Sequence, residues 1–78
     1  MSAERVLARR RAIGLRVRAA REGAGLTLEA VWLRSGIRIT TISDIEQGHR
    51  AAMIDTLIKI ADAIDVPLED FVRDKDKE

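Results

Sequence analysis

The sequence lacks cysteine and has little of several other residues that would mark particular classes of protein. Without cysteine there is neither a disulfide framework nor a thiolate metal site, and the single histidine, His49, cannot form a zinc site alone. No apolar run approaches the roughly 20 residues that a membrane-spanning helix needs. Arginines interrupt the N-terminal region where a secretion signal would be apolar, so we expect a cytoplasmic protein with no membrane partner.

The scarcity of catalytic groups argues against an enzyme. His49 is the only conventional general base near neutral pH, and it has no serine and aspartate at a spacing typical of a catalytic triad. The sequence also contains no glycine-rich phosphate loop and no paired carboxylates typical of a catalytic cleft. We therefore expect a protein that is not an enzyme and that binds neither a cofactor nor a metal.

The length and the charge distribution indicate one small domain with an electrostatic polarity. A chain of 78 residues buries a modest core and gains from tight helix packing or dimerisation. Its net charge of +1 hides a gradient: residues 1–25 carry seven arginines and two glutamates, whereas residues 51–78 carry four basic and eight acidic residues. This gradient suggests a face that meets an anionic partner, although arginines that solvate a helix face explain it equally well.

Apolar residues recur at intervals of three and four along the chain, which is the period of an amphipathic helix rather than of a strand. The pattern predicts an all-α fold, a compact bundle of about five short helices. We expect residues 1–12 to be a basic N-terminal extension of the first helix and residues 13–72 to be the folded domain. Residues 73–78 read as a charged tail.

Glycines divide the first half of the chain into helices. The apolar stripe of the first helix consists of Ile13, Val17, Ala20 and Ala24. This helix ends where Gly23 or Gly25 can adopt the left-handed cap conformation. Thr27 is a good N-cap for a second, short helix that Gly36 ends. Val31 faces the core from this helix, together with Leu28 or Trp32.

The second half of the chain contains three further predicted helices. The third extends from about residue 39 to 47, with Ile42 and Ile45 directed toward the core. The fourth is the most clearly amphipathic, and its predicted core face consists of Ile54, Leu57, Ile58, Ala61 and Ile64. Pro67 suits the first turn of a fifth helix, which buries Leu68, Phe71 and Val72.

Five short motifs follow one another in order between residues 13 and 72. They are "LRVRAAREGAGLT", "SGI", "TISDIEQGHR", "DTLIKIADA" and "VPLEDF". In this order they resemble the phage-repressor/Cro-type (Xre-like) helix-turn-helix family. The resemblance implies a lambda-repressor-like DNA-binding domain, with residues 26–48 as the helix-turn-helix and Gly36 at its turn. It also implies an ion pair between Arg21 and Glu46 that orients the third helix, with two independent surface charges as the alternative.

The resemblance implies binding of double-stranded DNA, with the third helix in the major groove. Transferred residue by residue, the base-facing positions are Ile39, Thr40, Ser43 and Asp44, with Arg38 and Thr41 nearby. The backbone-facing positions are Thr27, Gln47, His49 and Arg50. Alternatives remain open for several of these residues, because Ile39 can seal the turn and Asp44 can be a solvated charge or pair with Arg38. Arginines 9–11 form either an arm toward DNA or a solvated extension of the first helix.

Several residues depart from the pattern of the family. Leu28 and Trp32 stand where the family commonly has a phosphate-binding glutamine and a small alanine. Arg38 replaces a capping serine or threonine, Asp44 replaces a residue that is often basic or an amide, and Asp65 stands where a glycine commonly follows the fourth helix. The candidates for an exposed apolar surface are therefore Leu15, Leu28, Trp32, Leu33 and Ile39. A contiguous patch of such residues is typical of a protein-binding surface.

Two functions remain open on the sequence. The first is a sequence-specific DNA-binding transcriptional regulator of bacterial or phage type that acts as a homodimer. Its expected dimer surface is Leu68, Phe71 and Val72, unless these residues only close the monomer core. The second is a helix-turn-helix used mainly to bind a protein partner, as an antitoxin or a regulatory partner would, through Leu28, Trp32, Leu33 and Ile39.

Overall fold

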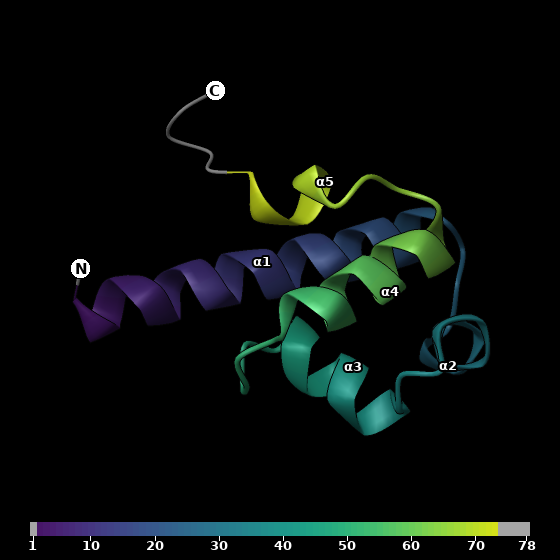
Figure 1. Cartoon of the computed structure of the whole chain (residues 1–78), viewed down its shortest axis with the longest axis horizontal. Helices are drawn as coiled ribbons and strands as arrows, with labels where there is room; N and C mark the ends of the chain where they lie inside the picture. The colour runs from purple at the N-terminus through teal and green to yellow at the C-terminus, as the bar shows by residue number, and fades with distance from the viewer. Residues whose placement is uncertain (1, 74–78) are drawn as a thin grey trace.

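The longest helix of the computed structural model, α1 (Ala3–Gly23), is the element against which α3, α4 and α5 pack (Figure 1). The structure describes residues 2–73, so residues 74–78 of the expected charged tail lie outside the described residues. The shorter helices are α2 (Leu28–Ser35), α3 (Ile39–Glu46), α4 (Ile54–Ile64) and α5 (Glu69–Val72). This confirms the predicted all-α fold of five helices.

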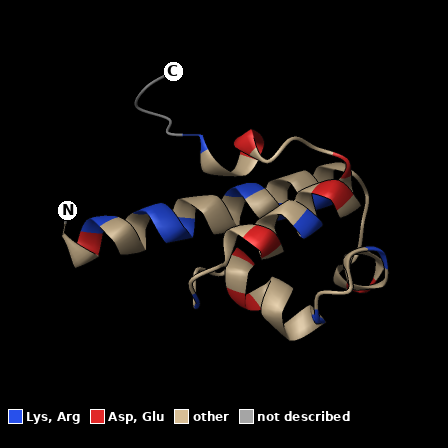
Figure 2. Ribbon diagram, viewed as in Figure 1, with Lys and Arg blue, Asp and Glu red and all other residues tan. Residues whose placement is uncertain are grey.

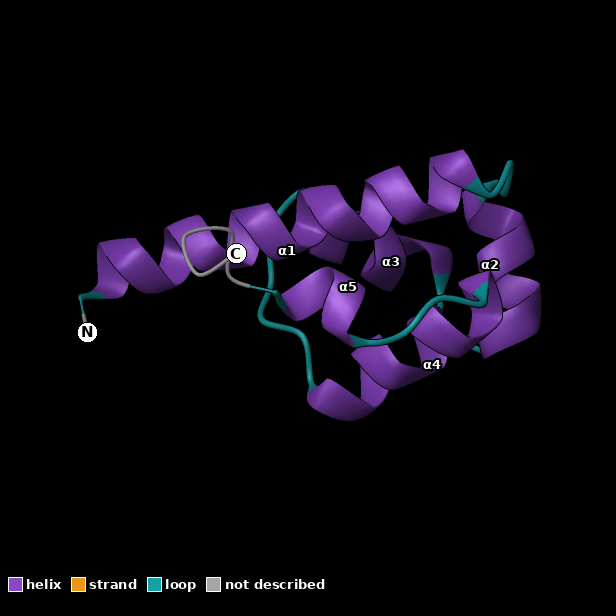
Figure 3. Ribbon diagram, turned by 90° about the horizontal axis from the view of Figure 1, so that it is seen from above, coloured by secondary structure: helices purple, strands orange, loops and turns teal. Residues whose placement is uncertain are grey.

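The helices are arranged on two sides of α1. Helix α5 lies on one side of α1 and α3 on the other in the view of Figure 1, and both pack against α1. Helix α2 packs on α3 and α4 rather than on α1, and this completes the helix-turn-helix. The first turns of α1 project beyond the other helices in the views of both Figure 1 and Figure 3. Within the described residues, no helix combines the length and the apolar character that crossing a membrane requires.

The helix boundaries follow from local capping chemistry. Thr27 is the N-cap of α2, because its hydroxyl oxygen accepts a hydrogen bond from the backbone N–H of Ala30 at 3.0 Å. Gly36 ends α2 with φ at 77°, a left-handed conformation that a residue without Cβ adopts at little cost. Asp65 ends α4 in the same conformation, with φ at 68°, although it carries a side chain. The chain therefore reverses direction at both places where the family pattern expects a glycine.

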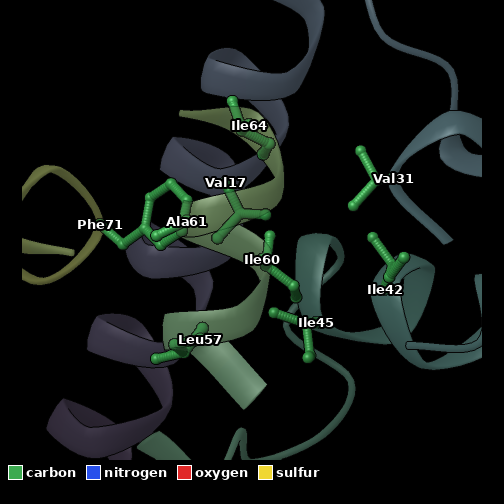
Figure 4. Close-up of a cluster of buried hydrophobic side chains, with 9 residues drawn as sticks. All are labelled: Val17, Val31, Ile42, Ile45, Leu57, Ile60, Ala61, Ile64 and Phe71. Atoms are coloured by element: carbon green, nitrogen blue, oxygen red, sulfur yellow. The ribbon is translucent and has the colours of Figure 1, made fainter. Parts of the chain in front are cut away.

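Nine apolar side chains from all five helices form the core, which Figure 4 shows. They are Val17, Val31, Ile42, Ile45, Leu57, Ile60, Ala61, Ile64 and Phe71. Phe71 is fully buried, and the arginines of α1 hold the helix that carries it. Arg9 donates to the carbonyl oxygen of Val72 at 3.3 Å, and Arg16 donates to that of Asp70 at the same distance. Two of the seven arginines of α1 thus hold α5, the last helix of the domain.

Two predicted core faces are wrong in part. Ile54 and Ile58 are 55% and 41% exposed, whereas Ile60, absent from the predicted face of α4, is fully buried. The buried face follows positions 57, 60, 61 and 64, and α4 carries a second apolar stripe beside it that the spacing alone does not separate. Ala24, assigned to the stripe of α1, lies past the end of that helix and is exposed.

Candidate nucleic-acid interface

Helix α3 is anchored on one side and presents polar side chains on the other. Ile42 and Ile45 are 0% and 2% exposed and fix the inner face. At 100° per residue, Thr40, Ser43 and Gln47 lie on the opposite face, where Thr40 and Gln47 are exposed and Ser43 is half-buried. The outer face of α3 is therefore a polar surface that remains accessible to a partner.

The backbone of α1 supports the C-terminal end of α3 directly. Gly14 is buried, and a Cβ at this position would overlap the carbonyl oxygens of Ile45 and Glu46. Only a glycine permits so close an approach between two helix backbones. Gly14 is a functional residue that the apolar pattern does not identify, although an isolated glycine within a helical pattern is a signal for close packing.

A buried ion pair joins the same two helices. The Arg21 guanidinium donates through Nε to Glu46 Oε2 at 2.7 Å and through Nη2 to Glu46 Oε1 at 2.9 Å. Its Nη1 also donates to the carbonyl oxygen of Leu26 at 2.9 Å. The hydrogen bond to Glu46 raises the pKa of Arg21, although partial burial opposes this change. The implied pair is thus present as a bidentate contact that orients α3, and not as two independent surface charges.

The first turn of α3 begins without a side-chain cap. Its N-cap, Arg38, makes no capping hydrogen bond, as the departure from the usual serine or threonine suggests. The turn before it is held instead by Ser35, whose hydroxyl oxygen accepts from the backbone N–H of Ile37 at 3.0 Å. Arg38 is exposed at this end of α3, beside the positions expected to meet base edges.

Several polar side chains around α3 bond to one another. Gln47 Nε2 donates to Ser43 Oγ at 2.8 Å, which fixes two side chains of the outer face. Arg50 Nη1 donates to Thr41 Oγ1 at 3.4 Å, and Arg50 Nε lies 3.7 Å from Asp44 Oδ2. The intramolecular partner of Asp44 is therefore Arg50, and the alternative pairing with Arg38 is not found. This contact also places Arg50 along the C-terminal half of α3.

The remaining expected contact residues lie around the same helix. Thr27 is exposed at the start of α2, His49 and Arg50 are exposed in the loop after α3, and Ile39 is half-buried in its first turn. Figure 2 shows that α3 carries acidic but no basic residues, whereas basic residues lie at the segments that flank it. Nine of the ten residues expected to contact DNA thus lie on α3 or in the segments next to it, and Thr27 lies at the start of α2.

The proposed apolar patch is smaller than the sequence suggests. Trp32 is 41% exposed and lines a shallow hollow of about 350 Å³ with Arg38, Ile39 and Thr40. Leu33 is also exposed, at 70%, whereas Leu28 is half-buried and packs against the core. The indole is accommodated by lying toward solvent, at the end of α3 where base contacts are expected.

These features define a helix-turn-helix DNA-binding domain, and comparison with known families agrees. The family model described as helix-turn-helix (HTH_3) matches residues 17–71, and the chain belongs to this Xre/Cro-type family of DNA-binding domains, which are not enzymes. Its structure is similar to that of the restriction-modification controller protein C.AhdI from Aeromonas hydrophila, with a TM-score of 0.79 and 26% sequence identity. The match covers 82% of this chain and 97% of C.AhdI. A search of curated protein sequences found no match.

Proposed function

We propose that the chain is a sequence-specific transcriptional regulator that reads the major groove with α3. The observation that carries this proposal is the accessible polar face of α3, held in a fixed orientation by Ile42, Ile45 and the pair between Arg21 and Glu46. An α-helix fits the major groove, where each base pair presents a distinct pattern of donors and acceptors. The similarity to a restriction-modification controller protein supports a regulatory role.

Within this proposal the two ends of α3 have different tasks. Thr40 and Ser43 donate to base edges or contact thymine methyl groups, with Arg38 and Ile39 beside them. Gln47, His49 and Arg50 bind phosphates at the other end, and Thr27 does so at the start of α2. Asp44 can accept from a cytosine amino group through Oδ1, since its contact with Arg50 Nε, at 3.7 Å, involves Oδ2. Because both side chains are about half exposed, this ion pair is weak and leaves Arg50 free to bind a phosphate.

The test is selection of bound fragments from the source genome at two salt concentrations. We expect a two-fold symmetric site with half-sites about 34 Å apart and an affinity that falls steeply with salt. Thr40→Ala should relax the preference at one base position by about 0.5–1.5 kcal/mol, since a threonine hydroxyl makes a single hydrogen bond. Arg50→Ala should weaken binding to all sequences evenly. A folded wild-type protein that retains no fragment even at low salt contradicts the proposal.

We also propose that the regulator acts as a homodimer through the outer stripe of α4. Full burial of Phe71 favours the alternative that α5 closes the monomer core, although Leu68 and Val72 are only half-buried. Met53, Ile54 and Ile58 are instead exposed, at 71%, 55% and 41%. In a two-fold symmetric dimer the same surface of each protomer faces its copy, so charged residues on that surface must be able to pair with the same residues of the partner. Asp55 and Lys59, one helical turn apart, satisfy this condition when Asp55 of one protomer meets Lys59 of its partner.

A second candidate function is protein binding at the hollow formed by Trp32 and Ile39. The partly exposed indole favours it, because aromatic side chains are enriched in protein interfaces. Trp32 is the single tryptophan of the sequence, so its fluorescence reports on this hollow. If DNA covers the hollow, saturating operator DNA should change the emission of Trp32, and Trp32→Ala should weaken DNA binding. Unchanged emission and unchanged DNA affinity would favour a protein partner at this position.

A further inference from the structure

Three arginines in the N-terminal half of α1, Arg5, Arg10 and Arg11, have guanidinium groups without a hydrogen-bond or ion-pair partner among the described residues. Arg9 and Arg16 bond to carbonyl oxygens of the α5 region. Arg10 and Arg11, in contrast, form no hydrogen bond or ion pair with any residue in the range 2–73. A guanidinium group that bonds to no other residue of the protein is available to an anionic partner.

The packing of α1 on α3 places Arg10 and Arg11 beside the loop that follows α3. A Cβ at Gly48 would lie 2.8 Å from Cγ and 3.1 Å from Cα of Arg11, so the stem of Arg11 lies directly over the end of α3. Gly14, one turn further along α1, lies against the backbone of α3. The approach at Gly14 is between two backbones, whereas that at Gly48 involves Cα and the first side-chain carbons of Arg11. Together they place the base of the Arg11 side chain beside the loop that follows α3.

Arg10 and Arg50 line the same hollow at the C-terminal end of α3. Arg9 also lines this hollow of about 240 Å³, whose other described lining residues are apolar and include Ile45 and Ala52. No carboxylate lines the hollow among the described residues, so nothing there neutralises Arg10. Figure 2 shows the basic residues of the N-terminal half of α1 near those of the loop after α3. The cations of two separate elements therefore converge at the C-terminal end of α3.

We propose that Arg10 and Arg11 extend the phosphate-binding surface of the recognition helix, so that the sugar-phosphate backbone passes from the loop at Arg50 onto the N-terminal half of α1. The partner is the same DNA duplex, and this inference rests on the proposed function. A contact of this kind adds affinity without sequence preference, because phosphates are the same at every base pair. It also assigns a role to a segment that precedes the part of the chain matched by the family model.

The experiment measures the salt dependence of DNA affinity for the wild type, Arg10→Gln, Arg11→Gln and the double variant, with Arg5→Gln as control. Arg5 is exposed on another face of the same helix, and its side chain carries the same charge. Each phosphate contact that is lost should reduce the slope of log affinity against log salt by about 0.9. For two lost contacts, the advantage of the wild type should shrink about tenfold between 50 and 200 mM salt. Arg5→Gln should follow the wild type.

The outcomes separate this inference from the proposed function. A wild type that binds DNA while the double variant keeps its slope overturns the role of Arg10 and Arg11 and leaves the function of α3 intact. An equal loss in Arg5→Gln overturns it as well, because the effect would then follow net charge alone. Failure of the wild type to bind any fragment overturns both proposals. Thermal unfolding monitored by circular dichroism establishes that each variant keeps its helices.

Discussion

Arg18 and Arg21 lie three positions apart on α1, and each forms an ion pair. The two pairs differ greatly in their exposure to solvent. The side chains of Arg21 and Glu46 are 12% and 6% exposed, whereas those of Arg18 and Glu22 are 58% and 55% exposed. A charge left without its partner in the protein interior is costly, whereas water solvates an exposed one. The same substitution should therefore have unequal effects on the free energy of unfolding.

We expect Glu46→Gln to reduce the free energy of unfolding by about 3 kcal/mol and Glu22→Gln to reduce it by less than about 1 kcal/mol. Urea denaturation followed by circular dichroism measures both. Because the pKa of Arg21 is raised in the folded state, its contribution is complete below its ordinary pKa and is lost only in strongly alkaline solution. The difference between the two variants should thus persist from mildly acidic to mildly alkaline pH. Equal losses in the free energy of unfolding would mean that the Arg21–Glu46 pair stabilises the fold no more than an ordinary surface pair does.

At the level of single residues, the sequence predicts what local chemistry determines. The cap at Thr27, the turn at Gly36 and the absence of a cap at Arg38 each depend on a few neighbouring atoms, and all three are found. The pairing of Asp44 with Arg50 rather than Arg38 depends on how the loop after α3 folds back. Loop geometry of this kind is set by tertiary packing, so the residue pattern leaves both partners open.

The elements show the same division between local and tertiary information. Cap residues and glycines predict where α2 begins and ends, whereas Pro67, expected in the first turn of the fifth helix, lies before α5. The periodicity assigns Ile54 and Ile58 to the core face of α4 and omits Ile60. Three isoleucines on neighbouring faces of one helix have equal hydrophobicity, so only the directions of α1 and α2 decide which of them is buried. The exposed polar face of α3 was predictable because the three isoleucines of the helix, Ile39, Ile42 and Ile45, recur at intervals of three and leave threonine, serine and aspartate between them.

The contact between α1 and α3 supplies a test at the scale of elements. Gly14→Ala inserts a Cβ where the carbonyl oxygens of Ile45 and Glu46 lie, so the two helices must move apart. We expect a loss of about 1–3 kcal/mol in the free energy of unfolding, together with weaker DNA binding because α3 is displaced. Chemical denaturation and DNA titration measure the two effects.

Gly23→Ala is the matched control for this substitution. Gly23 lies in the same helix, and a Cβ there meets nothing within 4 Å. Alanine is a better helix former than glycine by up to about 1 kcal/mol, so this variant should be as stable as the wild type or more stable. If Gly14→Ala behaved like Gly23→Ala, the close backbone approach would not be what positions α3.

At the scale of the whole molecule, the arginines at the basic end of the charge gradient have three different roles. Arg9 and Arg16 bond to the α5 region, and Arg21 orients α3. In the proposals above, Arg10 and Arg11 continue the phosphate-binding surface. The basic first third of the sequence is therefore neither a uniform DNA-binding arm nor a uniformly solvated helix face. Composition predicts the polarity, but it cannot assign individual arginines, because that depends on which face of α1 packs against α3.

The proposed homodimer gives a prediction for the assembled molecule. Ile54→Glu combined with Ile58→Glu places two carboxylates in the exposed stripe of α4, and each would face its own copy across the two-fold axis. We expect sedimentation equilibrium to show a monomer where the wild type is a dimer. Both side chains are largely exposed, so the helical content should not change.

Loss of the dimer should also make binding to the two half-sites independent, because each protomer then binds DNA without the other. The affinity for a full symmetric operator should fall toward that for a single half-site, whose own affinity should stay the same. Leu15→Glu is the control, since Leu15 is 64% exposed on α1 and lies outside the stripe. A double variant that remains dimeric would exclude α4 as the interface and return attention to Leu68 and Val72, the half-buried residues of the α5 region. A wild type that is monomeric at operator-binding concentrations would exclude the homodimer itself.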